Sequence, residues 1–277
     1  MKKLITRTLS AFVFAIIVIG AIFMGQYAYS LLFLFVSIVC MYEYYRALQN
    51  KGIKVNAIEG IIIGSIMYCI TAAVSLFDYS PIMLLLLFPT LLLLWILQLW
   101  KKNENPFLSI SFTACGIVYI SIPLAATLFL AKPTFADISD YNPLVMLGIL
   151  VLQWVSDSFA YLTGICIGRH PLFKRHSPKK SWEGFIGGFT FCILAGYLIG
   201  RYIDTPFATI DWIVMATMVP VRGTLGDLVE SMFKRSMDIK DTGNIMPGHG
   251  GLLDRFDSLI MVTPFLLGYL LLKYLVL

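Results

Sequence analysis

Charged residues are scarce in this sequence. They make up 13% of its 277 residues, whereas 58% of the residues are hydrophobic and the mean hydropathy is +0.82. A soluble domain carries about 25% charged residues, so this scarcity excludes an ordinary water-soluble protein. At about 20 apolar residues per membrane-spanning helix, the chain has room for roughly nine or ten spans and for no large soluble domain.

Closely spaced cysteines are also missing, as is a basic stripe interleaved with aromatic residues. The five cysteines lie singly within apolar runs, which argues against a disulfide framework or a zinc site. The formal net charge is +5, but the basic residues fall between the apolar runs, so we expect no nucleic-acid partner. Membrane topology explains these charges better.

Long apolar runs predict an all-α fold: a polytopic integral membrane protein with about nine transmembrane helices. The first run is long for a secretory signal and is followed almost at once by a second, so we interpret it as an uncleaved anchor. The expected spans are residues 9–25, 28–45, 57–77, 81–100, 107–131, 143–168, 182–200, 208–232 and 258–277. Residues 1–140 then form an N-terminal region of about five spans, and residues 141–277 a C-terminal catalytic region with polar loops 169–181 and 233–257.

Basic residues occur before the first span and in every second connection, while the other connections are neutral, acidic or balanced. They are Lys2, Lys3 and Arg7, then Arg46, Lys51 and Lys54, then Lys101 and Lys102, then Arg169, Lys174, Arg175, Lys179 and Lys180. Basic loops are retained in the cytoplasm, so the pattern predicts a cytoplasmic N-terminus and an outside C-terminus. We expect a multi-pass protein of the inner (cytoplasmic) cell membrane, with both polar loops and the active site facing the cytoplasm.

A polar stripe emerges from the eighth apolar run. Asp227, Glu230, Ser231 and Lys234 follow the spacing i, i+3, i+4 and i+7 and therefore share one helix face. An ionisable group at membrane depth is costly and normally faces a bundle interior or a wet cavity, so the stripe is a candidate functional site. A solvated helix end is the alternative, and it is stronger for Glu230 than for Asp227.

Two carboxylates begin the last helix with i, i+3 spacing, at Asp254 and Asp257. They repel each other unless a cation lies beside them, and Mg²⁺ is usually held by one or two carboxylates together with substrate phosphates. We therefore expect Asp227 to join them at one magnesium site, with capping of the helix by acidic residues as the alternative. A glycine-rich turn at residues 247–251 would let backbone N–H groups approach phosphate oxygens.

The other polar loop holds five basic residues between Gly168 and Gly184 and no acidic residue before Glu183. This composition predicts an anion-attracting surface, although membrane topology alone also demands basic residues here. The helix before it places Asp157 on one face with Tyr161 and two glycines, which suits a cavity wall or close helix packing.

One further pattern spans both carboxylate sets. It comprises Ser231, Lys234, Arg235, Lys240, Asp241, His249, Gly250, Gly251, Asp254, Arg255 and Asp257. Its residue types and spacing resemble the signature of the phosphatidate cytidylyltransferases, also called CDP-diacylglycerol synthases. The segments 226–228 and 177–184 also look like elements of that family, whereas Met246 replaces its usual branched aliphatic residue or phenylalanine. The resemblance is specific over the C-terminal half and only topological over the first 140 residues.

This resemblance implies a nucleotidyltransferase that transfers a cytidylyl group from CTP to phosphatidate, giving CDP-diacylglycerol and pyrophosphate for phospholipid biosynthesis. It implies Mg²⁺ held by Asp227, Asp254 and Asp257, leaves room for a second, monovalent cation, and is compatible with a homodimer. The catalytic residues it implies are these three aspartates with Lys234, Arg235 and Arg255; the substrate-binding residues are Lys179, Lys180, Ser231, Lys240, His249, Gly250 and Gly251. From its place on the polar helix face, we expect Asp157 to bind substrate as well.

Two other functions are compatible with a polar cluster in a membrane. A CTP-dependent lipid-alcohol kinase would also need cation-held phosphates, but it should require a base for its hydroxyl nucleophile. An ion or solute transporter could use the aspartates as a relay. A transporter is disfavoured because the charged residues converge on one side of the expected bundle.

Overall fold

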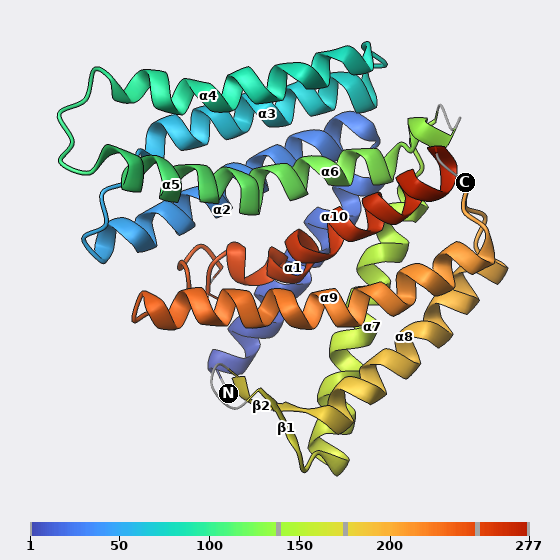
Figure 1. The fold of residues 1–277 in the computed structure, drawn as a ribbon. Coiled ribbons are helices and arrows are strands. Elements are labelled where there is room, and N and C mark those ends of the chain that lie inside the picture. Colours follow the sequence, from blue (N-terminus) through green and yellow to red (C-terminus); the bar gives the residue numbers. More distant parts are fainter. Residues whose placement is uncertain (1, 137–139, 174–176, 247–249, 276–277) are drawn as a thin grey trace.

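A computed structural model shows the chain as a bundle of long helices with one small β-hairpin (Figure 1). It describes all residues except 1, 137–139, 174–176, 247–249 and 276–277, and it describes the backbone alone at 2–8, 136 and 178.

The elements follow one another along the chain with short connections. They are α1 (Lys2–Phe23), α2 (Gln26–Asn50), α3 (Ala57–Leu76), η1 (Pro81–Leu86), α4 (Leu87–Gln98), α5 (Pro106–Gly116), η2 (Ile117–Ser121), α6 (Ile122–Ala131), η3 (Thr134–Ala136), α7 (Pro143–Ile167), β1 (Pro171–Phe173), β2 (Ser177–Ser181), α8 (Trp182–Tyr202), α9 (Thr209–Ser236) and α10 (Leu253–Leu275). The helical segments η1 and α4 run on as one span, and so do α5, η2 and α6.

The predicted all-α, multi-pass class is confirmed. Within the described residues, eight helices are long and apolar enough to cross a membrane, and each overlaps one of the expected runs. The first run corresponds to α1, whose described apolar part, Leu9–Phe23, is shorter than the others. The count of nine spans and the orientation of the termini therefore stay predictions.

Helix starts follow local sequence signals. Proline occupies one of the first two positions of η1, α5 and α7, where its missing N–H needs no partner. Asn142 caps α7 by accepting the Leu144 N–H at 2.9 Å, and Ser181 caps α8 by accepting the Gly184 N–H at 3.1 Å. These caps fix where the two helices around the hairpin begin.

The basic connections lie together at one end of the bundle, with the N-terminus and the hairpin (Figure 1). Lys51 forms an ion pair with Asp238 beyond the end of α9, and Lys54 lies 3.4 Å from Glu104 in the α4–α5 connection. Three connections that are distant in sequence therefore meet at this end. The structure thus supports the alternation of charged connections, though not which end faces the cytoplasm.

The opposite end holds the C-terminus and the remaining connections (Figure 1). Lys132 lies here and departs from the expected absence of basic residues. It is buried and forms an ion pair of 2.7 Å with Asp78, so its charge is compensated locally. An acidic neighbour of this kind makes Lys132 compatible with the alternation of basic connections.

Two details go beyond the sequence-based expectation. The 169–181 loop contains an antiparallel hairpin of β1 and β2, with Phe173 opposite Ser177, where a purely helical fold was expected. The last helix begins at Leu253, before the expected apolar run, and Asp254 and Asp257 lie in its first turns as their i, i+3 spacing predicted. The earlier start carries polar residues into the helix because its first amides are hydrogen-bonded by side chains from elsewhere in the chain.

Candidate active site

Four of the acidic residues singled out in the sequence line one cavity of about 480 Å³ between α1, α7, α9 and α10. They are Asp157, Asp227, Asp254 and Asp257, and Arg255 lines the same cavity. The acids of α9 and α10 therefore line the same cavity, and their binding of one magnesium ion stays a prediction. The apolar wall includes Phe14 of α1, so the cavity also draws on the N-terminal region.

Close packing of α9 against α10 brings Asp227 to the cavity. A Cβ atom at Gly226 would lie 2.8 Å from the Asp257 carbonyl oxygen, so only glycine permits this approach. The Ser258 hydroxyl donates to Asp227 Oδ1 at 2.9 Å, and Lys180 of β2 donates to Oδ2. Asp227 thus connects the hairpin to α10.

Asp257 is a buried carboxyl group, 6% exposed, that no cation of the described chain compensates. Its Oδ1 accepts the Ser258 N–H at 2.7 Å, and its carboxyl group lies close enough to that of Asp227 to interact with it electrostatically. No Lys, Arg or His side chain that the structure describes forms an ion pair with Asp257. A buried carboxylate next to a second carboxylate is costly unless a cation joins them.

Asp254 has different partners although it lies one turn before Asp257. Its Oδ1 accepts from Lys234 at 2.7 Å, and its Oδ2 accepts from the Thr242 N–H, the Thr242 hydroxyl and the Gly251 N–H at 3.0, 3.0 and 2.8 Å. Asp254 therefore holds the α9–α10 loop onto the helix. In the described part of the chain, no three His, Cys, Asp or Glu side chains are arranged to hold one metal ion.

Lys234 lies between two buried acids. Besides Asp254, it contacts Glu230 Oε2 at 2.5 Å, and Glu230 is 3% exposed. This burial favours the functional interpretation of the polar stripe over a solvated helix end. Glu230 Oε1 is buried with no hydrogen-bond partner among the described residues.

The hairpin presents only part of its basic charge to the cavity. Lys180 reaches Asp227, whereas Lys179 is exposed. Glu183 fastens the start of the hairpin by accepting the Arg169 and His170 N–H groups at 3.1 and 3.2 Å and by contacting His170 Nδ1 at 2.5 Å. These bonds hold the hairpin over the first turn of α8.

The remaining predicted residues surround this centre. Ser231 is half-buried on α9, whereas Arg235 and Lys240 are exposed at its end and in the following loop. Gly250 has φ 85°, the left-handed conformation that favours glycine, and His249 lies outside the described residues. On α7, Gly164 packs against Gly184 of α8, so the small residues of that face serve close helix packing, while Asp157 lines the cavity.

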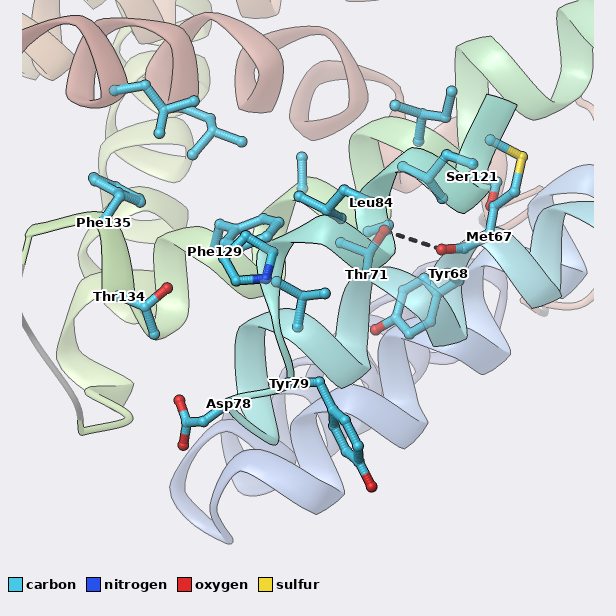
Figure 2. Close-up of a pocket in the computed structure, with 18 of the residues that line it drawn as sticks. Met67, Tyr68, Thr71, Asp78, Tyr79, Leu84, Ser121, Phe129, Thr134 and Phe135 are labelled. Atoms are coloured by element: carbon cyan, nitrogen blue, oxygen red, sulfur yellow. Dashed lines mark hydrogen bonds between the residues drawn. The ribbon is translucent and has the colours of Figure 1, made fainter. Parts of the chain in front are cut away.

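A larger cavity, of about 660 Å³, lies near the opposite end of the bundle (Figure 2). Its labelled lining includes Met67, Leu84 and Phe129, and Asp78 lies at its edge. Asp78 is paired with Lys132, so this cavity offers no uncompensated charge to a phosphate or a cation. The smaller, acid-lined cavity is therefore the candidate active site.

Comparison with known proteins shows to which family the chain belongs. The profile of the cytidylyltransferase family matches residues 5–274. The chain belongs to this family. A Bacillus subtilis phosphatidate cytidylyltransferase is 32% identical to this cytidylyltransferase over 267 residues, covering 96% of this chain and 95% of the relative. A Staphylococcus haemolyticus protein of the same name is 31% identical over 261 residues (94% and 96%), and one from Thermotoga maritima is 35% identical over 170 residues (59% and 60%).

Two residues of this cytidylyltransferase that the sequence did not reveal lie beside the site. Glu43 of α2 is buried and bonded to the start of α10. Tyr119 lies in the π-helical turn η2, within electrostatic reach of Asp227 and Asp257, and its buried hydroxyl has no partner among the described residues. Each stands alone in an apolar run, so the sequence carries no signal for either. The π-helical turn that holds Tyr119, a feature often found at functional sites, is visible only in the structure.

Proposed function

We propose that this protein is a phosphatidate cytidylyltransferase, transferring the cytidylyl group of CTP to the phosphate of phosphatidate. The observation that carries the proposal is the acid-lined cavity with adjoining lysines, built within apolar helices of a cytidylyltransferase-family chain. Relatives that match almost the whole chain bear the name of this activity. A site between membrane-spanning helices suits a substrate that is itself a lipid.

The reaction is a phosphoryl-type substitution. A phosphate oxygen of phosphatidate bonds to the α-phosphorus of CTP, the bond from that phosphorus to the bridging oxygen breaks, and pyrophosphate leaves with the electron pair. The phosphate group of phosphatidate is largely ionised at neutral pH, since the second pKa of phosphomonoesters is about 6, so no dedicated base is required. Catalysis then consists of positioning and of charge neutralisation.

The basic residues of the chain have different roles in this positioning and charge neutralisation. Lys180 and Arg255 stand at the cavity, where their charges would offset the repulsion between two anionic substrates. Lys234 is held between Glu230 and Asp254 and so orders the start of α10. The exposed Lys179, Arg235 and Lys240 would attract the nucleotide to this end of the bundle.

The donor set fits Mg²⁺. Carboxylate oxygens are ligands that Mg²⁺ prefers, and Asp257 is a buried carboxylate beside Asp227 without a cation of its own. Asp227 and Asp257 would hold the ion together with substrate phosphates, and Asp254 would support them through the loop. When bound, Mg²⁺ supplies positive charge that stabilises the leaving pyrophosphate.

The orientation proposed for the protein places the site at the cytoplasmic face of the inner membrane. The support is the gathering of the basic connections at the site end of the bundle, since basic loops are retained in the cytoplasm. CTP is a cytoplasmic metabolite, so this orientation would give it access to the cavity.

The test is product formation by the purified protein in mixed micelles with CTP and Mg²⁺. We expect pyrophosphate and CDP-diacylglycerol in equal amounts, and only when phosphatidate is present. Diacylglycerol replaces phosphatidate in the control, which should give no product. Formation of CDP and a phosphorylated lipid from diacylglycerol would instead indicate a lipid-alcohol kinase. Absence of any CTP turnover with either lipid would contradict both enzymatic functions.

A further inference from the structure

Glu43 is a buried acid in the middle of an apolar helix of the N-terminal region. Its residue is 2% exposed, and no Lys, Arg or His side chain in the described part of the chain forms an ion pair with it. Burying a carboxylate is costly unless hydrogen bonds or a charge compensate it. The partners of Glu43 therefore indicate its role.

Those partners are the first amides of α10. Glu43 Oε1 accepts the Leu252 N–H at 3.0 Å, and Oε2 accepts the Leu253 N–H at 2.8 Å. The first N–H groups of a helix have no partner within the helix, and the helix dipole favours negative charge at this end. Glu43 thus caps the helix that carries Asp254 and Asp257, from about 210 positions earlier in the chain.

Two glycines of the α9–α10 loop lie close against the Glu43 carboxylate. A Cβ atom at Gly243 would lie 2.1 Å from Oε1, and one at Gly251 would lie 2.6 Å from Oε2. Any larger residue at either position would displace the carboxylate or the loop. Gly251, expected from the sequence to contact substrate, is thus packed against Glu43.

Thr242 connects this cap to the active site. Its hydroxyl lies 3.4 Å from Glu43 Oε2 and 3.0 Å from Asp254 Oδ2, and its N–H donates to the same oxygen of Asp254. Glu43 and Asp254 therefore hold the same short loop from opposite sides. A displacement of the Glu43 carboxylate would move the first turn of α10 and the aspartates on it.

We propose that Glu43 is a positioning residue for cytidylyl transfer: it fixes the α9–α10 loop and the first turn of α10, and so sets the geometry of Asp254 and Asp257. The proposal rests on the proposed function for its kinetic consequence. It also assigns to the N-terminal region a direct role in the active site. A residue with a purely structural role would stabilise the whole bundle. All the hydrogen bonds of Glu43 described above go instead to the α9–α10 loop and the start of α10.

The test compares Glu43→Gln with Glu59→Gln, each purified in the same detergent. Glu59 is a matched control because it is an acid of the N-terminal region that pairs with Lys101, away from the cavity. The readouts are kcat and KM for CTP and phosphatidate, and hydrogen exchange by mass spectrometry. The side-chain amide that Glu43→Gln introduces would retain one acceptor oxygen and would direct its own N–H groups at a backbone N–H donor.

For Glu43→Gln we expect kcat to fall by about tenfold to a hundredfold with a smaller change in KM, because a small misplacement of catalytic groups has effects of this size. Exchange should become faster in peptides covering residues 240–256 and stay unchanged in those covering α7 and α8. Glu59→Gln should match the wild type in kcat and in hydrogen exchange. Wild-type kcat and wild-type exchange in Glu43→Gln would overturn the proposal, and so would equally faster exchange throughout the bundle.

If Glu43→Gln does not fold, Gly243→Ala takes its place, since the three atoms nearest to its added methyl group all belong to the Glu43 side chain. For Gly243→Ala we also expect faster hydrogen exchange in peptides covering residues 240–256 and the same fall in kcat. Wild-type exchange together with wild-type kcat would overturn the proposal. A wild-type protein that forms no CDP-diacylglycerol would overturn the proposed function alone. The exchange comparison would still decide whether Glu43 holds the loop.

Discussion

Asp211 at the start of α9 and the half-buried Asp227 in its second half both contact α10, and the two acids have different partners. At the far end, Asp211 is fully buried and accepts from Lys273 at 2.5 Å, Tyr269 at 2.8 Å and Tyr274 at 3.2 Å. At the site end, Asp227 contacts Lys180, and its neighbour Asp257 has no ion pair with a described residue.

This difference separates a structural acid from an acid that awaits a ligand. Asp211 is satisfied by the chain itself, so nothing needs to bind there. Asp257 has no ion-pair partner among the described residues, and it lines a cavity large enough for part of a substrate. The two cavities follow the same division, since the larger one at the far end is apolar and the smaller one is lined by acids.

The largest expected effect follows from removing charge at the site end. Asp257→Asn and Asp227→Asn should each lower kcat by at least about a hundredfold and raise the Mg²⁺ concentration needed for half-maximal activity, because each removes a proposed ligand. Initial rates against Mg²⁺ concentration measure both effects. Wild-type turnover with unchanged Mg²⁺ dependence in both variants would refute the metal pair.

Asp254→Asn should separate the supporting acid from the proposed ligands. Its partners are Lys234 and loop donors, so we expect a fall in kcat of about tenfold to a hundredfold through misplacement of α10. The Mg²⁺ dependence should stay close to that of the wild type. A large shift in Mg²⁺ dependence would show instead that Asp254 binds the ion directly.

Lys180→Ala tests the hairpin against its exposed neighbour. Lys180 contacts Asp227, whereas Lys179 is exposed, so Lys180→Ala should raise KM for an anionic substrate or lower kcat by about tenfold, and Lys179→Ala should change either value by about twofold or less. Steady-state kinetics of the two variants provide the comparison. Equal effects would mean that the hairpin acts through its general charge.

Asp211→Asn tests whether the buried acid at the far end of α9 has a structural role only. Removing one partner of a buried ion pair leaves Lys273 uncompensated, so the Tm should fall by several degrees while kcat and KM of the folded protein stay unchanged. Thermal unfolding in detergent and kinetics below the transition measure the two properties. A loss of activity comparable with that of Asp257→Asn would remove the distinction between the two ends.

The smallest effect concerns the exposed ion pair between Lys51 and Asp238. The hydrogen bond and charge of Lys51 lower the pKa of the Asp238 carboxyl group. A lowered pKa stabilises the fold above the ordinary aspartate pKa of about 4, and this stabilisation is lost as the pH falls through the folded-state value. Asp238→Asn should lower the Tm by about a degree at pH 7 in low salt, and less in acid. A larger Tm difference between Asp238→Asn and the wild type in acid than at pH 7 would contradict this direction of the pH dependence.

Eight of the expected spans correspond to long apolar helices in the described residues, because long apolar runs are local signals. The i, i+3 spacing likewise placed Asp254 and Asp257 together in the first turns of α10, whereas their joining Asp227 at one magnesium site stays a prediction. The sequence did not predict that Asp254 and Asp257 would have different partners, since that depends on where the loop places Thr242 and Gly251. The hairpin was missed because its two short strands carry turn and charge signals only.

Glu43 could not be predicted for a different reason. A single acid within an apolar run does not reveal which helix it will meet, and its partners lie more than 190 positions away. The division of the chain into an N-terminal and a C-terminal region likewise gave no hint that α1 and α2 would contribute to the site. Contacts of this kind are properties of the packed bundle.

Direct metal binding tests the central claim, that the site end of α9 and α10 holds a divalent cation which the far end does not. Mn²⁺ can replace Mg²⁺ at oxygen sites, and its binding to the purified protein can be followed by electron paramagnetic resonance, with CTP present and absent. We predict one bound ion in the wild type and in Asp211→Asn, with affinity at least about tenfold weaker in Asp227→Asn and Asp257→Asn. Unchanged Mn²⁺ affinity in both site variants would contradict the account.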